Sequence, residues 1–168
     1  MKVLVAYHTR TGNTKMIADA VAEVLKTTPV AIDANTTADE ADFVAVGFWV
    51  DRGTANKEAA DFIKTLRGKK VAFFATLGAD PKSQHAMDSL KNAAALLDES
   101  NEVVGNFICQ GKIDPKLIEA MAKFPAGHPH AMDEARRARH KAASTHPDEQ
   151  DVADAKAAFG LIAEKVGL

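Results

Sequence analysis

Short apolar runs alternate with segments of helical periodicity over the first 110 residues of the chain. The apolar runs predict strands at residues 2–7, 30–33, 43–48, 71–75 and 103–109. Helices are predicted at residues 13–26, 55–66 and 80–97, the last with Asp80 as its N-cap and Pro81 as its first residue. Strands interleaved with helices favour an α/β fold in which a parallel sheet carries helices on both faces.

The turn between the first strand and the first helix is rich in hydroxyl and amide side chains. It reads Tyr7-His8-Thr9-Arg10-Thr11-Gly12-Asn13-Thr14. At the start of a helix, the free backbone N–H groups and the helix dipole favour a bound anion. The turn lacks both the lysine of the triphosphate loop and the GxGxxG pattern of dinucleotide folds. It therefore predicts a donor-rich pocket for a single terminal phosphate.

The same turn resembles the phosphate loop of flavodoxins, roughly Ser/Thr-x-Ser/Thr-Gly-Asn-Thr, and it occupies the same place after the first strand. The resemblance implies a flavodoxin-like α/β fold, with a five-stranded parallel sheet in the order 2-1-3-4-5, and FMN as the cofactor. The residues expected to bind FMN from this loop are His8, Thr9, Arg10, Thr11, Gly12, Asn13 and Thr14, and the His8 ring would either approach the phosphate or point outward. Because the family tends to use neutral donors, we expect the Arg10 side chain to face solvent.

Two further loops would flank the flavin ring. The first loop contributes Phe48, Trp49, Val50, Asp51, Arg52, Gly53 and Thr54, and the second contributes Thr76, Leu77, Gly78 and Ala79. Trp49 would either stack on the flat ring or simply close the end of the sheet. Gly53 would either let its peptide rotate towards the reduced ring, as in flavodoxins, or serve as a turn glycine before a helix capped by Thr54. The second loop has no aromatic residue, so either Leu77 covers the outer face of the ring or that face is open.

The bulk composition narrows the classes of function. The net charge of −2 gives no reason to expect a nucleic-acid or membrane-surface partner. The single cysteine, Cys109, excludes an intrachain disulfide and a cysteine-ligated iron–sulfur cluster, and its apolar surroundings predict a core residue. His128-Pro129-His130 is too sparse for zinc, so no metal site is expected. With no signal peptide and no long apolar run, we expect a cytoplasmic protein.

The residues after the last predicted strand are more than one closing helix needs. Helices are predicted at 114–124, 133–143 and 147–166, with a break at 125–130 and with Thr145 and Asp148 as a capping box for the last helix. We expect one flavodoxin-like domain, residues 1–168, with a helical insertion at 112–146. The insertion carries Arg136, Arg137, Arg139 and Lys141. It would form either a lid or docking face beside the flavin or a solvated helical hairpin.

These features favour an FMN-binding electron carrier. It would take electrons from a reductase and pass them to an acceptor enzyme, with a small anionic acceptor as another partner. The alternative is an FMN-dependent reductase or oxidase that acts on a quinone or a tetrapyrrole, in haem or bile-pigment metabolism, with a histidine of the insertion as proton donor. A third interpretation keeps the fold and the phosphate pocket without any redox role. The sequence leaves open whether the chain is itself an enzyme.

Overall fold

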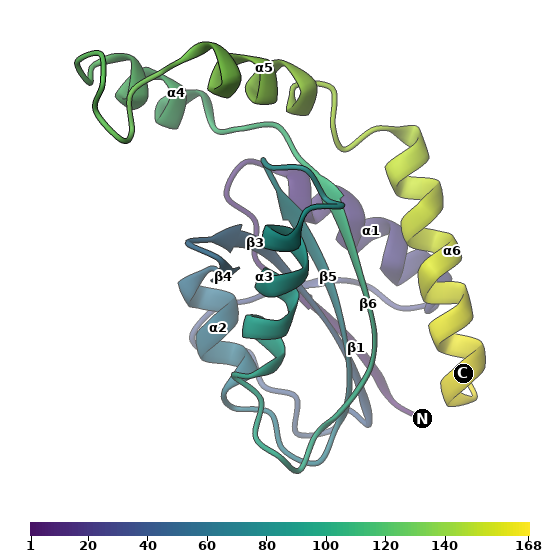
Figure 1. Ribbon diagram of the computed structural model, residues 1–168. Helices are drawn as coiled ribbons and strands as arrows, with labels where there is room; N and C mark the ends of the chain where they lie inside the picture. Colours follow the sequence, from purple (N-terminus) through teal and green to yellow (C-terminus); the bar gives the residue numbers. More distant parts are fainter.

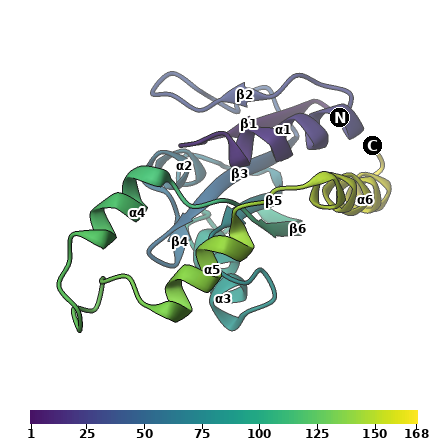
Figure 2. The same ribbon diagram turned by 90° about the horizontal axis from the view of Figure 1, so that it is seen from above.

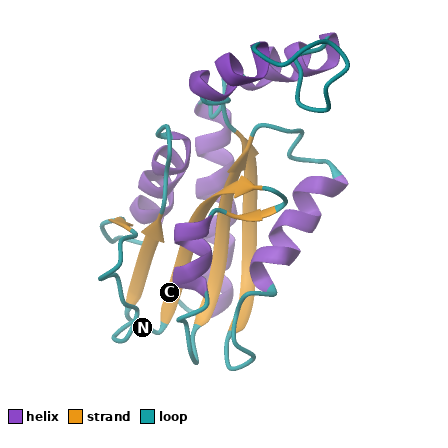
Figure 3. Cartoon of the chain, turned by 90° about the vertical axis from the view of Figure 1, so that its left-hand side faces the viewer, coloured by secondary structure: helices purple, strands orange, loops and turns teal.

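The computed structural model describes residues 1–168 and has a central sheet with helices on both faces (Figures 1 and 3). Its parallel strands are β1 (Val3–Tyr7), β2 (Val30–Ala31), β3 (Phe43–Asp51), β5 (Lys70–Leu77) and β6 (Glu102–Gln110). They lie in the order β2-β1-β3-β5-β6. Counted without the short strand β4, this is the predicted 2-1-3-4-5 order, so the predicted α/β fold is confirmed.

Four helices cover the sheet, two on each face. The first pair is α1 (Asn13–Val24) and α6 (Glu149–Val166), and the second pair is α2 (Lys57–Ile63) and α3 (Gln84–Ala94). Successive strand residues alternate between the two layers: Phe43 packs with α1 and α6, whereas Val44 packs with α2. Phe74 and Phe159 meet edge to face at 5.9 Å between ring centroids. Both faces of the central strands are therefore apolar and buried.

The segment after β3 differs from the prediction. The strand continues to Asp51 and folds back into a two-residue antiparallel strand, β4 (Thr54–Ala55). The turn between them places Arg52 at φ 51° and Gly53 at φ 79°, which is the geometry of a tight hairpin turn. Thr54 is therefore a strand residue and not a helix cap, and α2 begins later, with Asn56 as its N-cap.

Helix α3 also begins later than predicted. Asp80 accepts hydrogen bonds from the backbone N–H groups of Lys82 and Ser83, so it closes a local turn instead of capping the helix. Ser83 is the N-cap, and its hydroxyl accepts from the N–H of Ala86. The helix ends at Ala94, three residues before the predicted end, and α1 ends at Val24 because Lys26 takes a positive φ.

The C-terminal part contains the three predicted helices. They are α4 (Pro115–Ala122), α5 (Glu134–Ala143) and α6, capped by Asp114, Asp133 and Asp148. The capping box of α6 pairs Asp148 with Asp151, so the predicted pairing of Thr145 with Asp148 is wrong. Helices α4 and α5 lie beyond the carboxyl ends of the strands, at the top of Figure 1, and Figure 2 shows them from above. Helix α4 buries none of its residues.

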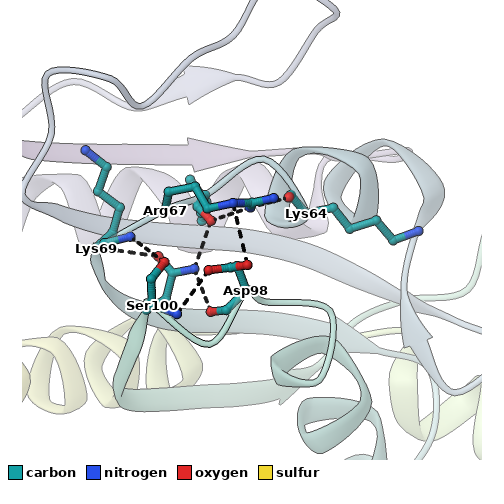
Figure 4. Close-up of polar contacts among 8 residues, drawn as sticks. Lys64, Arg67, Lys69, Asp98 and Ser100 are labelled. Carbon is teal, nitrogen blue, oxygen red and sulfur yellow. Dashed lines mark hydrogen bonds and ion pairs between the residues drawn. The ribbon is translucent and has the colours of Figure 1, made fainter.

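The opposite, amino-terminal end of the sheet is closed by polar contacts between two loops (Figure 4). The backbone N–H of Gly68 donates to the Ser100 hydroxyl, and Arg67 lies 3.6 Å from the Asp98 carboxylate. The Ser100 hydrogen bonds lower the pKa of Asp98. These contacts fix the starts of β5 and β6. No helix in this structure has the length and apolar character needed to cross a membrane.

Candidate functional site

A cavity of about 450 Å³ lies at the carboxyl end of the sheet. This is within the size range of small-molecule sites, and the position is where ligands bind in open α/β sheets. The predicted site residues that line it come from the loops after β1, β3 and β5: Thr9, Arg10, Thr11, Asn13, Thr14, Trp49, Val50, Asp51, Arg52, Thr76, Leu77 and Gly78. The structure thus brings all three predicted loops to one cavity.

A fourth wall comes from the segment after β6, where the insertion was one expected neighbour of the flavin but no residue was predicted to bind it. It contributes Gly111, Lys112, Ile113, Asp114 and Leu117. The sequence did hold a signal, because every parallel strand ends at the same edge of the sheet and the loop after the last strand must pass close by. Gly78 makes this approach possible, since a side chain there would overlap Ile113.

The start of α1 presents unpaired backbone donors. Gly12, the N-cap, takes φ 97° and makes no side-chain cap, while its own N–H donates to the Thr9 hydroxyl at 3.0 Å. The N–H groups of Asn13, Thr14 and Lys15 have no acceptor within the protein. Unpaired N–H groups at the positive end of the helix dipole form a site for an anion.

The Thr14 side chain ties this loop to a neighbouring strand. Its hydroxyl lies 3.0 Å from that of Thr76, and both residues are buried. Because Thr76 is near the end of β5, the hydrogen bond fixes the first loop against the third.

Arg10 was predicted to face solvent, but its side chain also makes two contacts within the protein. Its Nε lies 3.0 Å from the Asp114 carboxylate, and its guanidinium carbon lies 5.8 Å from the centroid of the Trp49 ring. The Asp114 side chain is only 14 % exposed, so its carboxylate needs a nearby cation. Asn13 also binds the segment after β6, because its side-chain amide donates a hydrogen bond to the Lys112 carbonyl at 2.8 Å. Two side chains of the first loop therefore hold the segment that follows β6.

Trp49 is held by polar contacts on its edge. Its indole Nε1–H donates to Nδ1 of His8 at 3.1 Å, and the Asn56 amide donates to the same nitrogen at 3.0 Å. Both groups can only donate, so Nδ1 accepts and the His8 proton is on Nε2. Asn56 is fully buried and also donates to Glu58, which lowers the Glu58 pKa. The His8 ring thus positions the Trp49 indole. Asn56 supports the same contact and is a site residue that the prediction missed.

The remaining predicted residues do not line the cavity. Strand alternation turns Phe48 into the core, where it contacts Phe73 edge to face at 6.0 Å. The Gly53 carbonyl accepts a hydrogen bond from the Asn92 side chain at 2.7 Å, which holds it in the hairpin turn. Thr54 pairs within β4, and Gly12 and Ala79 lie beside lining residues.

The residues of the cavity fit the FMN that the resemblance implies. Backbone N–H groups and threonine hydroxyls suit a terminal phosphate, and the Trp49 indole suits a flat ring. Ile113, Leu117 and Leu77 add apolar surface to the lining of the cavity. The donor set and the apolar surface therefore match the two ends of this ligand.

Comparisons with known proteins agree with this geometry. A family model described as a flavodoxin domain matches residues 4–160. A flavodoxin-like domain-containing protein BilS of Clostridioides difficile (strain CD3) is 32 % identical over 164 residues, covering 92 % of each chain. A protein of the same description from Clostridium symbiosum (strain WAL-14163) is 29 % identical over 178 residues, covering 91 % of each chain.

Solved structures share the fold at lower identity. The oxidised flavodoxin 2 of Bacillus cereus has a TM-score of 0.62 and 20 % identity, covering 98 % of this chain and 99 % of its own. The flavodoxin of Streptococcus pneumonia TIGR4 has a TM-score of 0.58 and 18 % identity, covering 98 % of this chain and 99 % of its own. Together with the family model, which spans most of the sequence, these findings show that the chain belongs to the flavodoxin family.

Proposed function

We propose that this protein binds FMN at the carboxyl end of its sheet and carries electrons to a partner redox enzyme. The main support is that the unpaired N–H groups of Asn13 and Thr14 and the indole of Trp49 belong to one cavity. A donor cluster for an anion beside an aromatic surface suits a ligand with a phosphate at one end and a flat ring at the other.

Bound FMN would supply electron-transfer chemistry, and the protein would bind and orient it. The Thr9 hydroxyl accepts from Gly12, so its own hydrogen is free to donate to the phosphate. The Asn13 amide uses one hydrogen on Lys112 and keeps a second for the ligand. Trp49 would cover one face of the ring, and Leu77 would exclude water on the other side. Membership of the flavodoxin family favours electron transfer over a non-redox role.

Titration calorimetry with FMN and with riboflavin tests the phosphate site. Two hydrogen bonds to a charged phosphate contribute about 3 kcal/mol, so we expect FMN to bind about 100-fold more tightly than riboflavin. FMN should also quench the emission of Trp49, the only tryptophan. Equal affinity for the two ligands, or no binding of either, would contradict the proposal.

A matched pair of glycine substitutions separates binding from folding. Gly12 and Gly127 both have positive φ, and a Cβ would meet no atom within 4 Å at either position. Alanine at either site should cost about 1–2 kcal/mol of backbone strain. Only Gly12→Ala should weaken FMN binding, by about tenfold or more, since it distorts the loop that presents the N–H groups. Equal affinities in the two variants would show that FMN binds elsewhere.

Electron transfer is tested on the FMN-loaded protein after photoreduction. The reduced protein should pass electrons to a redox protein in a second-order reaction. If it instead turns over a quinone or a tetrapyrrole repeatedly without a partner, the chain is an FMN-dependent oxidoreductase.

A further inference from the structure

The charged residues are distributed unevenly between one C-terminal segment and the rest of the chain. Residues 112–146, which we call the overhang, contain seven lysines and arginines against four aspartates and glutamates. Because the whole chain has a net charge of −2, the overhang has +3 and the rest has −5. Figures 1 and 3 show the overhang beyond the carboxyl ends of the strands. The cavity lies at this same end of the sheet, and its lining includes residues of the overhang.

The cations of α5 are mostly unpaired. Arg137, Arg139 and Lys141 are exposed, and none lies within ion-pair distance of a carboxylate. Arg136 is turned inward, where its guanidinium donates to the carbonyls of Ala131 and Pro129. Burial lowers the pKa of His140 on the same inner side, so the charge of α5 is concentrated on its outward residues.

Helix α4 and the residues just after it expose an apolar stripe. Leu117 and Met121 lie four residues apart, which places them on one side of the helix, and Phe124 follows two residues after its end. Leu117 and Phe124 are each 40 % exposed. Leu117 also lines the cavity, so the stripe begins at the proposed flavin site and runs away from it.

The overhang is held in place at its base. The Lys112 N–H donates to the His146 carbonyl at 2.8 Å, and Arg10 and Asn13 hold Asp114 and Lys112 from the first loop. These contacts hold the two ends of the overhang together, and its first residues beside the cavity.

We propose that the overhang is the docking surface for the redox partner, and that this partner is a protein with an acidic patch beside its own redox centre. An apolar stripe with charged residues around it is the ordinary anatomy of a protein interface, and opposite charges speed the encounter. A protein fits better than an anionic membrane, because the remaining −5 of the molecule would be repelled by the bilayer. The proposal rests on the proposed function, since it names the partner for electrons from the same cavity.

Two haem proteins serve as probes: cytochrome b5, which is acidic, and cytochrome c, which is basic. In each reaction one electron leaves the reduced FMN protein and converts ferric haem to ferrous haem. We expect the rate constant with cytochrome b5 to fall steeply as the ionic strength rises, and that with cytochrome c to change little.

Charge reversal provides the matched comparison. Arg137→Glu/Arg139→Glu/Lys141→Glu should lower the cytochrome b5 rate constant about tenfold or more at low ionic strength. Lys2→Glu/Lys26→Glu/Lys64→Glu makes the same change in net charge at the start of β1 and at the ends of α1 and α2, on the amino-terminal side of the sheet. This control should change the rate constant less than about threefold, because these sites lie far from the cavity.

The outcomes distinguish the two proposals. Equal rate constants in both triple variants, or binding to phosphatidylserine vesicles with no preference for cytochrome b5, would overturn the docking proposal while FMN binding stood. If FMN does not bind, the proposed function fails. Docking is then measured on the apoprotein, as NMR shift changes in the overhang on adding cytochrome b5, and unchanged spectra overturn it.

Discussion

At the scale of single residues, the Trp49–His8 contact gives a directly measurable prediction. His8→Phe removes the acceptor of both Trp49 Nε1 and the buried Asn56 amide. A buried donor left without a partner costs about 1–3 kcal/mol, and the indole loses its anchor. We therefore expect the apoprotein emission to shift to the red, its anisotropy to fall, and FMN binding to weaken.

The conservative substitution His8→Gln retains an acceptor and should restore most of the emission. His130→Phe, at an exposed position far along the overhang, should leave the emission unchanged. Emission that is the same in His8→Phe and in the wild type would show that His8 does not position the ring.

The residues of the first loop were predictable because their role depends on neighbours in sequence. Thr9, Gly12 and Asn13 sit at a helix start, and a helix start has free donors in any fold. The environment of Arg10 could not be predicted in this way, since its partner, Asp114, lies about a hundred positions away. Asn56 was missed for the same reason: its contact with His8 exists only once β1 and β3 pair.

At the scale of elements, the N-terminus of α6 gives a pH-dependent stability. His146 Nδ1 lies 2.6 Å from the Asp151 carboxylate, and this hydrogen bond raises the His146 pKa. A raised folded-state pKa adds stability that is fully present below the unfolded-state pKa and is lost as the pH rises through the folded-state value. We expect the difference in unfolding free energy between wild type and His146→Gln to shrink from pH 6 to pH 8, as measured by urea denaturation.

The lowered pKa of His140 would change the unfolding free energy with pH in the opposite sense. Because His140 is present in both proteins, its contribution cancels when their unfolding free energies are subtracted. A difference that stayed constant over this range would mean that His146 and Asp151 are not coupled in solution.

Long periodic elements were predicted well and short ones were not. The 18 residues of α6 carry their own apolar spacing, which local rules describe, although the predicted capping pair was wrong. Strand β4 has two residues and exists because β3 extends far enough to pair with it. Both Asp80 and Ser83 could cap α3, and residue propensity alone does not decide which of them accepts the backbone hydrogen bond at the helix start.

At the scale of the whole molecule, the overhang leaves the core and returns to it at one place. The hydrogen bond from the Lys112 N–H to the His146 carbonyl brings its two ends together. Helix α4 buries no residue, and in α5 only Ala143 is buried. The core therefore has its own hydrophobic layers, one packed with α1 and α6 and one with α2 and α3, without help from the overhang.

Excising residues 114–144 and joining Ile113 to Thr145 through two glycines tests this arrangement. The shortened chain should still unfold cooperatively in urea, because both apolar layers remain intact. It keeps Trp49 and the unpaired N–H groups of α1, so FMN affinity should fall by no more than about tenfold, or about 1.4 kcal/mol. After photoreduction it should lose its preference for cytochrome b5, since the cations and the apolar stripe are gone. A shortened chain that cannot fold would show that the core depends on the overhang, and one that keeps the preference would place the docking surface on the core itself.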